Sequence, residues 1–330
     1  MKAVILKEHA GPQSLSLGDI PTPTVRPGTV LVRAVAASAN PVDIRVCEGA
    51  SVSPLLPTTL GCDVAGIVEE IGEGVTGFLP GDAVFGCVGG VRGSDGTLAE
   101  FVLADAKLLA LKPRSLSMRE AAALPLVAIT AFDGIDRAGV SPGQHVLIHG
   151  GTGGVGHIAL QIALARGAAV STTVSERSLA EAARLGAANV IDYRQETVES
   201  YTQRLTGGAG FDIVFDTIGG AHLKQSFQAA RNGGQVISTI GLAEIDLSPM
   251  HVKALSLHVV FMLLPLLTGE GRERHGAILR ATAALADEGK LRPLLDKSRF
   301  TLENAGEAYR RLQSGKAMGK VVIDVAEAAS

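Results

Sequence analysis

The chain has 330 residues, of which 46% are hydrophobic and 19% are charged, and its formal net charge at pH 7 is −3. This length is enough for two domains with substantial cores, and the near balance of charges gives no electrostatic reason to expect nucleic acid or an anionic membrane as a partner. The three cysteines form no C-x-x-C pair, which favours a reducing, cytoplasmic location over a disulfide framework.

Residues 1 to about 120 show the pattern of a β-rich domain. Short runs of strand-forming residues alternate with glycine and proline turns, and strands are expected at Lys2–Leu6, Thr29–Ala37, Gly61–Ile71 and Gly81–Phe85. Short strands with frequent Gly or Pro are typical of compact all-β domains. We therefore expect a barrel-like domain in this part of the chain.

From Met118 onwards the pattern changes to alternating helices and strands. Two helical segments come first, at 118–124 and 125–132. Strands are then expected at 145–148, 169–173, 188–191, 211–216 and 235–240, separated by helices at 155–166, 179–185, 198–205 and 221–230. Aliphatic strands that alternate with helices indicate a parallel, doubly wound sheet. A helix at 302–312 and a strand at 320–325 follow, and the pattern leaves open whether they rejoin the first domain.

The stretch His149–Gly156 connects the expected strand 145–148 to the helix that follows it, and it contains Gly151-x-Gly153-x-x-Gly156. In such a turn one glycine permits the tight bend, one lets the backbone approach a phosphate, and one allows the helix to pack closely on the strand. Unpaired N–H groups and the positive end of the helix dipole would face a bound pyrophosphate. The stretch therefore predicts a dinucleotide-binding site, the alternative being a glycine turn without a ligand.

The end of the second strand of this sheet bears on the choice of nucleotide. NAD-binding folds usually carry an acidic residue about 20 positions beyond the glycines, where it binds the ribose 2′-hydroxyl, and Ser175 occupies that position here. A serine can hydrogen-bond a 2′-phosphate without repelling it, and Arg177 can add a charge and a donor fork. These residues favour NADPH. NADH remains an alternative cofactor, because Glu176 can reach a ribose. Arg177 can also be a solvated surface charge.

Further motifs follow one another along nearly the whole chain: 39–43 (ANPVD), 61–66 (GCDVAG), 81–84 (GDAV), 96–101 (GTLAEF), 124–131, 185–193, 211–220 and 319–322 (GKVV). Together with the glycine turn, this order resembles the medium-chain dehydrogenase/reductase superfamily, in its zinc-independent quinone oxidoreductase (zeta-crystallin-like) branch.

The resemblance implies an α/β protein with two domains. A GroES-like, β-rich barrel domain is implied at 1–120, and a Rossmann domain with a doubly wound parallel sheet at 121–265. A C-terminal segment, 266–330, is implied to rejoin the substrate domain. The cleft between the domains is implied to hold the nicotinamide ring of NADPH.

The resemblance also implies the site residues. Asn40 and Thr130 would be catalytic residues that line the nicotinamide, with the Asn40 amide as a hydrogen-bond donor to the acceptor. Tyr193 matches a tyrosine that NADPH-dependent relatives place near the 2′-phosphate. The implied cofactor-binding set is Asn40, Thr130, Gly151, Thr152, Gly153, Gly154, Val155, Ser175, Arg177, Tyr193, Gly241 and Phe261.

No metal is expected. Zinc-dependent members of the superfamily use a Cys, a His and a Cys as ligands, and motif matching places Asn40, Cys62 and Leu126 at these positions. Asparagine and leucine offer neither the nitrogen nor the sulfur that Zn²⁺ prefers, so Cys62 is expected to be a small buried hydrophobe. Asp43 and Asp63 are further cleft candidates, and each can equally be a structural carboxylate satisfied by backbone donors or an arginine.

The implied reaction is NADPH-dependent, zinc-independent hydride transfer to a quinone or an α,β-unsaturated carbonyl compound. Family members often carry a tyrosine and an arginine where this chain has Arg45 and Cys47, so we expect a different substrate pocket. Two alternatives remain open: a crystallin-like NADPH-binding protein with weak turnover, and an alcohol or aldehyde dehydrogenase of the same superfamily.

The apolar run Leu255–Leu267 is shorter than the ~20 residues that span a bilayer, so no membrane partner is expected. An exposed apolar patch of this size usually marks an interface, and in relatives the edge strands of two Rossmann sheets pair. We therefore expect a homodimer, the alternative being that the run forms a buried strand.

Overall fold

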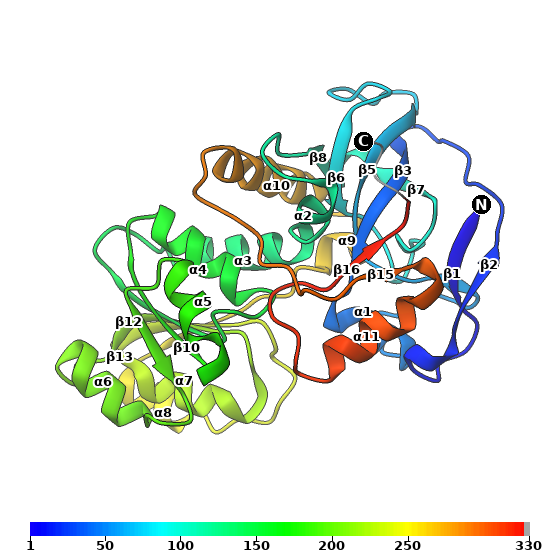
Figure 1. The fold of residues 1–330 in the computed structure, drawn as a ribbon. Helices are drawn as coiled ribbons and strands as arrows, with labels where there is room; N and C mark the ends of the chain where they lie inside the picture. The colour runs from blue at the N-terminus through cyan, green and yellow to red at the C-terminus, as the bar shows by residue number, and fades with distance from the viewer. Residues whose placement is uncertain (327–330) are drawn as a thin grey trace. The chain divides into compact units, whose positions relative to one another are not determined.

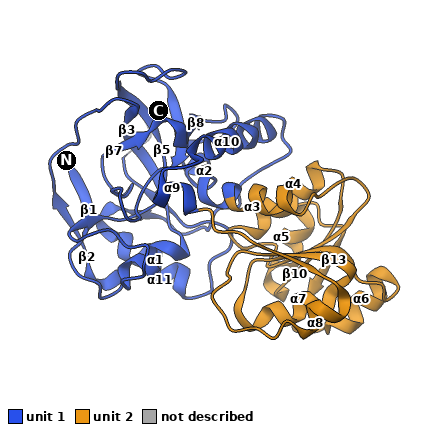
Figure 2. Cartoon of the chain, turned by 180° about the vertical axis from the view of Figure 1, so that it is seen from behind, with its two compact units in different colours: residues 1–129, 263–330 blue, residues 130–262 orange. Residues whose placement is uncertain are grey.

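The computed structural model describes residues 1–326, which fold into two compact units. Unit 1 combines Met1–Ile129 with Leu263–Ser330, and unit 2 is Thr130–Met262 (Figure 2). The domain limits expected from the sequence follow residues 120 and 265, whereas the compact units divide after residues 129 and 262. Within residues 1–326, no helix is both long and apolar enough to cross a membrane.

Unit 1 is built on two sheets. Its strands are β1 (Lys2–Leu6), β2 (Leu15–Asp19), β3 (Thr29–Ser38), β4 (Thr58–Thr59), β5 (Asp63–Ile71), β6 (Ala83–Cys87), β7 (Phe101–Asp105), β8 (Leu109–Leu111), β15 (Phe300–Thr301) and β16 (Val322–Asp324). The larger sheet has seven strands in the order β15-β16-β3-β5-β6-β8, with β7 paired to β3, and the smaller has the order β2-β1-β4. The long strand β3 is largely buried, and β5, β7 and β16 pair with its two edges.

The helices of unit 1 come from both ends of the chain. They are α1 (Pro41–Cys47), α2 (Met118–Ala122), α9 (Leu264–Thr268), α10 (Arg272–Asp287) and α11 (Ala305–Gln313), with short 3-10 helices η1 (Pro12–Ser14), η2 (Ala106–Leu108) and η5 (Leu302–Asn304). Strand β16 runs antiparallel to β3, with Ile323 opposite Ala37. Tyr309 of α11 is buried in the same apolar core as Val46 of α1. The C-terminal segment is therefore an integral part of unit 1.

Unit 2 has one six-stranded parallel sheet with helices on both faces (Figure 1). Its strands are β9 (His145–His149), β10 (Ala169–Val174), β11 (Asn189–Asp192), β12 (Phe211–Asp216), β13 (Ala230–Ser238) and β14 (Ser256–Val259). Its helices are α3 (Pro125–Arg137, which starts in unit 1), α4 (Gly156–Ala165), α5 (Leu179–Arg184), α6 (Val198–Thr206), α7 (Leu223–Ala229) and α8 (Ser248–Lys253), with 3-10 helices η3 (Glu176–Ser178) and η4 (Gly220–His222). The predicted doubly wound parallel sheet is confirmed.

The strand order of this sheet, β11-β10-β9-β12-β13-β14, reverses direction at β9. The chain moves outward from β9 through β10 to β11, then returns to place β12 on the other side of β9. His149 at the end of β9 is opposite Thr173 of β10 and Asp216 of β12. In open parallel sheets, ligands bind outside the carboxyl ends of the strands at this kind of switch point.

The apolar run Leu255–Leu267 is divided between an edge strand, β14, and a short helix, α9. Strand β14 ends the sheet and pairs only with β13 among the described strands. Val259 is 44% exposed and Phe261 is 49% exposed in the single chain. The run is therefore not a wholly buried strand.

Candidate nucleotide-binding and active site

The glycines of the β9–α4 turn are required by close packing. Gly150 has a φ of +77°, which favours glycine. A Cβ on Gly151 would lie 2.0 Å from Thr172 Oγ1, and a Cβ on Gly156 would lie 2.1 Å from the carbonyl oxygen of Gly150. The turn can fold in this way only because these glycines have no side chains. For the same reason, its backbone is open to a ligand.

The start of α4 offers hydrogen-bond donors. In the described part of the chain, the backbone N–H groups of Thr152, Gly154 and Val155 have no protein acceptor. The N–H groups of the first turn of a helix lack intrahelical partners, and the helix dipole adds positive potential there. These donors lie at the switch point of the sheet, so this end of α4 fits a pyrophosphate group.

Ser175 and Tyr193 follow the ends of two neighbouring strands. Val174 of β10 is opposite Asp192 of β11, and the Tyr193 N–H donates to the Val174 carbonyl at 3.2 Å. Arg177 lies two residues beyond Ser175, in η3, and is exposed. The residues predicted to bind the 2′-phosphate therefore gather at one place on the carboxyl edge, and their role there stays a prediction.

Gly241 and Phe261 occupy the other half of the same edge. Ser238 at the end of β13 is opposite Val259 at the end of β14, and the two predicted residues follow these strand ends. A Cβ on Gly241 would approach Val259 Cγ1 to 2.9 Å. The parallel sheet thus places residues that are predicted to bind the cofactor, and that are far apart in the sequence, on the same edge.

A pocket of about 340 Å³ opens beside the glycine turn in unit 2. His149, Thr173, Tyr193 and His222 are among the residues that line it. His149 is fully buried, and burial lowers the pKa of its imidazole to about 3, so this histidine is neutral. A neutral imidazole at the end of β9 adds no charge where the pyrophosphate is expected.

In unit 1, Asn40 lies at the N-terminus of α1 and is completely buried. Its side-chain nitrogen donates to Asp63 Oδ2 at 2.9 Å and to the Ser38 carbonyl at 3.4 Å. Its side-chain oxygen accepts a hydrogen bond from Lys320 Nζ. Because an ammonium only donates and a carboxylate only accepts, these partners fix which end of the amide is oxygen.

Asp63 and Lys320 form the centre of this buried cluster. Asp63 Oδ2 lies 3.5 Å from Lys320 Nζ and accepts from Ser38 Oγ at 2.8 Å, while Oδ1 accepts from the Leu126 N–H at 2.9 Å. Both side chains are almost inaccessible to solvent. The carboxylate is therefore structural and satisfied by its neighbours. The sequence suggested backbone donors or an arginine as its partners, and the structure has the Leu126 N–H as a backbone donor and a lysine as the cation.

Asp43 belongs to a second buried group next to Asn40. It accepts from the Asn40 N–H at 2.9 Å, from Cys62 Sγ at 3.3 Å and from the Tyr309 hydroxyl at 3.2 Å. Burial is the largest influence on this carboxyl and raises its pKa to about 7. Cys62 is a buried free thiol, as expected, and lies within this group.

The donor set around Asn40 does not fit a zinc ion. Of the three positions where zinc-dependent relatives carry ligands, Cys62 alone has a sulfur or nitrogen that Zn²⁺ prefers. The Lys320 ammonium already contacts Asn40 and Asp63, and a divalent cation would meet its charge. Across residues 1–326, no cluster of three or more His, Cys, Asp or Glu side chains is arranged to hold a metal.

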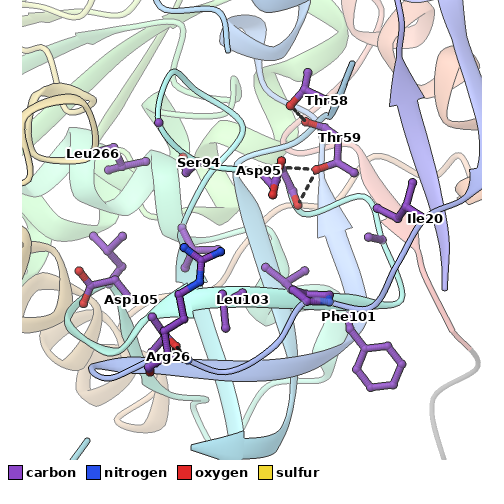
Figure 3. Close-up of a pocket in the computed structure, with 18 of the residues that line it drawn as sticks. Ile20, Arg26, Thr58, Thr59, Ser94, Asp95, Phe101, Leu103, Asp105 and Leu266 are labelled. Atoms are coloured by element: carbon purple, nitrogen blue, oxygen red, sulfur yellow. Dashed lines mark hydrogen bonds between the residues drawn. The ribbon is translucent and has the colours of Figure 1, made fainter. Parts of the chain in front are cut away.

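A larger pocket, of about 710 Å³, lies wholly within unit 1 (Figure 3). The Arg26 side chain extends into it from one wall, and Leu266 and Phe101 belong to other walls. None of the predicted site residues lines it. This pocket therefore shares no lining residue with the predicted nucleotide site.

Two of the residues in these sites were not predicted from the sequence. Lys320 belongs to the GKVV motif, but the motif gave no sign that its ammonium is buried against Asn40. Asp216 ends the predicted strand FDIVFD, and the structure shows it fully buried at the switch point. The sequence signal that could have pointed to Asp216 was a carboxylate at the carboxyl end of a parallel strand. Thr130 is a buried residue of α3, and its predicted contact with the nicotinamide stays a prediction.

Two family models match most of the chain. The alcohol dehydrogenase GroES-like domain matches residues 26–114, and the zinc-binding dehydrogenase model matches residues 185–323. A glycine turn at the switch point of a parallel sheet, in a chain that also carries a GroES-like domain, defines a nicotinamide-dependent oxidoreductase. The chain belongs to the quinone oxidoreductase branch of the medium-chain dehydrogenase/reductase superfamily.

Individual relatives support this assignment. The quinone oxidoreductase of Homo sapiens is 31% identical over 98% of this chain and 97% of that protein. The chloroplastic NADPH-dependent alkenal/one oxidoreductase of Arabidopsis thaliana is 32% identical over 98% of this chain and 79% of that protein. A solved alcohol dehydrogenase superfamily protein from Novosphingobium aromaticivorans superposes with a TM-score of 0.95 at 42% identity, covering 99% of this chain and 100% of that one.

Proposed function

We propose that this chain transfers a hydride from NADPH to a quinone or to the β-carbon of an α,β-unsaturated carbonyl compound. The observation that carries the proposal is the glycine turn at the switch point, where packing at Gly151 and Gly156 leaves bare backbone and free N–H donors. The names of two relatives, a quinone oxidoreductase and an NADPH-dependent alkenal/one oxidoreductase, support the acceptor class and the cofactor.

The proposed preference for NADPH rests on Ser175, Arg177 and Tyr193. These residues follow strands β10 and β11, on the same edge as the glycine turn. Tyr193 is 52% exposed and carries the Arg194 guanidinium 5.8 Å above its ring, so an exposed cation borders this position. Positive charge beside a serine favours a 2′-phosphate over a bare 2′-hydroxyl.

We propose that the reaction needs no zinc. The Lys320 ammonium already occupies the position between Asn40 and Asp63, where a divalent cation would meet its charge. Elemental analysis of purified, untagged protein should find well under one zinc per chain. Activity that is lost with a chelator and restored by Zn²⁺ would show that this part of the proposal is wrong.

When bound, NADPH supplies the hydride from C4 of its nicotinamide ring. Conjugation in a quinone or enone spreads the negative charge that arrives, so one hydrogen-bond donor and a proton from solvent are enough. Asn40 is the proposed donor and Thr130 the proposed wall of the nicotinamide site. The 3.4 Å contact from Asn40 to the Ser38 carbonyl is the weaker of its two, so this N–H is the one that an oxyanion would take.

Because Asn40 is completely buried, this role requires its side chain to become accessible when substrate binds. Asn40→Ala should then lower turnover by about 10- to 1000-fold. A smaller loss, with an unchanged Kd for NADPH, would show that Asn40 serves the buried cluster and does not touch the acceptor.

Initial rates of NADPH oxidation test the reaction itself. A panel of quinones, enones, aldehydes and, with NADP⁺, primary alcohols separates the candidate functions. We expect turnover with quinones or enones. Tight NADPH binding with almost no consumption would favour a crystallin-like binding protein, and alcohol oxidation without quinone or enone reduction would favour an alcohol dehydrogenase.

We also propose that the chain forms a homodimer. Strand β14 leaves one edge without a partner among the described strands, and the apolar Val259 beside it is exposed. An exposed strand edge is a template for pairing with another chain. The proposed location is the cytoplasm, which fits Cys47, Cys62 and Cys87 as buried free thiols.

A further inference from the structure

Asp216 is a completely buried carboxylate at the carboxyl end of β12, directly opposite His149 of β9. It therefore lies at the switch point of the sheet, beside the strand that leads into the glycine turn. An anion without hydrogen-bond partners at this place would repel a pyrophosphate. The buried position of Asp216 and its hydrogen-bond partners indicate its role.

Four donors surround the Asp216 carboxylate. Oδ1 accepts from the N–H groups of Ile218 and Gly219 at 2.7 and 2.8 Å. Oδ2 accepts from Ser226 Oγ at 2.7 Å and lies 3.0 Å from His222 Nδ1. Burial opposes the charge, but the hydrogen bonds from His222, Gly219 and Ser226 outweigh it and hold the pKa of Asp216 below its usual range. The carboxylate is thus a charged anchor for the segment that follows β12.

The anchored segment, residues 217–219, is tied to the glycine turn. Thr217 Oγ1 donates to the carbonyl oxygen of His149 at 2.7 Å. The turn begins at the next residue, Gly150, where a Cβ would lie 2.8 Å from the same hydroxyl. The rings of His149 and His222 also meet edge to face, with centroids 4.5 Å apart. The position of the glycine turn therefore depends on the segment that Asp216 holds.

We propose that Asp216 is a positioning residue for the dinucleotide. It holds residues 217–219 against the end of β9, so that this segment and the glycine turn form one rigid surface at the switch point. The carboxylate acts through its neighbours and does not touch the cofactor. This inference rests on the proposed function, because it assumes that the surface binds NADPH.

A charged carboxylate suits this task better than its amide. An asparagine would turn an NH₂ group either toward the two backbone N–H groups, which cannot accept a hydrogen bond, or toward Ser226 Oγ and His222 Nδ1, which would then have to change from donors to acceptors. Asp216→Asn keeps the size of the side chain and removes the charge that the four donors stabilise. Because binding geometry tolerates little displacement, the Kd for NADPH should rise by about tenfold or more.

Asp212 offers a matched control on the same strand. It lies at the amino end of β12, where it accepts from the His145 N–H at 2.8 Å and from Arg231 Nε at 2.6 Å. Asp212→Asn should therefore lower the melting temperature but leave the Kd for NADPH within about twofold of wild type, because its contacts are at the opposite end of the strand.

The experiment is a titration of the full chain with NADPH, followed by the fluorescence of the bound dihydronicotinamide, well below the melting temperature of each variant. Steady-state assays on the same samples should show a higher KM for NADPH in Asp216→Asn and a nearly unchanged kcat at saturation. A structural role alone would lower the melting temperature and leave both Kd and KM unchanged.

If Asp216→Asn does not fold, Thr217→Val decides the question, since it keeps the carboxylate and cuts only the bond to His149. A Kd within about twofold of wild type in every folded variant would overturn the inference. Failure of the wild-type chain to bind NADPH would instead refute the proposed function, so the two failures are distinguishable.

Discussion

The ammonium of Lys320 donates a hydrogen bond to the side-chain oxygen of Asn40, 280 positions away in the sequence. Lys320 also donates to the Ala39 carbonyl at 3.2 Å. The contact joins the C-terminal segment of unit 1 to the start of α1, and the same ammonium pairs with the buried Asp63 carboxylate. The orientation of a predicted site residue thus depends on a cation from the other end of the chain.

Lys320→Met should destabilise the protein strongly. It leaves the Asp63 carboxylate buried without its cation, which typically costs about 3–5 kcal/mol in the free energy of unfolding. Urea unfolding measures the loss, and Lys316→Met is the control because this lysine is exposed in the same segment. The double variant Asp63→Asn/Lys320→Met should recover part of the loss. Equal stability of Lys320→Met and wild type would contradict a buried ion pair.

Asp43 should make the stability fall with rising pH. Burial raises the pKa of Asp43 in the folded chain to about 7, above the ordinary value of 3.8. Between these values the folded state binds more protons than the unfolded state, so the free energy of unfolding decreases as pH rises. The contribution of this group is complete below pH 3.8 and is lost as the pH passes about 7.

The test of this pH dependence is urea unfolding at several pH values between 4 and 8 for wild type and Asp43→Asn. The free energy of unfolding should differ between the two proteins by an amount that changes with pH in this window. The slope of this change with pH should be at most that expected for one bound proton. If this difference in the free energy of unfolding does not change with pH, the folded structure does not raise the pKa of the Asp43 carboxyl.

The preference for NADPH should depend on Arg177 and Ser175. Loss of a charge-assisted hydrogen bond to the 2′-phosphate costs about 1.5–3 kcal/mol, roughly ten- to hundredfold in affinity. Arg177→Ala should therefore weaken NADPH and leave NADH nearly unchanged, and Ser175→Asp should weaken NADPH by repelling the phosphate. Fluorescence titrations with both nucleotides measure this, and equal losses for both in Arg177→Ala would make Arg177 a structural residue.

The homodimer should depend on the free edge of β14. A lysine at Val259 places a charge beside the edge where a second sheet would pair, which natural edge strands use to prevent pairing. Light scattering at micromolar concentration should give the mass of a dimer for wild type and that of a monomer for Val259→Lys. A monomeric wild type would rule out the proposed dimer.

Most of the fold could be predicted because its strands carry a clear signal. The run FDIVFD, between glycine turns, is strand β12 from Phe211 to Asp216, as predicted. Helix α10 was missed. Its buried face includes His275, Gly276 and Thr282, so the helical period is not visible as an apolar stripe. Gly276 is needed because a Cβ there would lie 2.6 Å from the Lys107 carbonyl oxygen, which only the folded structure reveals.

The candidate site also has one part that the sequence predicts and another part that it does not. The glycine turn could be predicted from local sequence, because the strand, the bend and the helix are contiguous. The buried partners could not: Lys320 and Asn40 meet only when the C-terminal segment returns to unit 1, and Asp216 gains its role from Thr217 and the end of β9. Contacts between distant segments carry no local period that a sequence pattern can show.

The most direct test of the proposed reaction follows the hydride itself. An enone is reduced with NADPH deuterated at C4, using each of the two stereoisomers in turn, and the product is examined by mass spectrometry and NMR. The proposed function predicts one deuterium on the β-carbon of the saturated ketone with one of the two isomers. A product without deuterium from either isomer, or deuterium on the carbonyl carbon of an alcohol, would contradict hydride transfer to the conjugated acceptor.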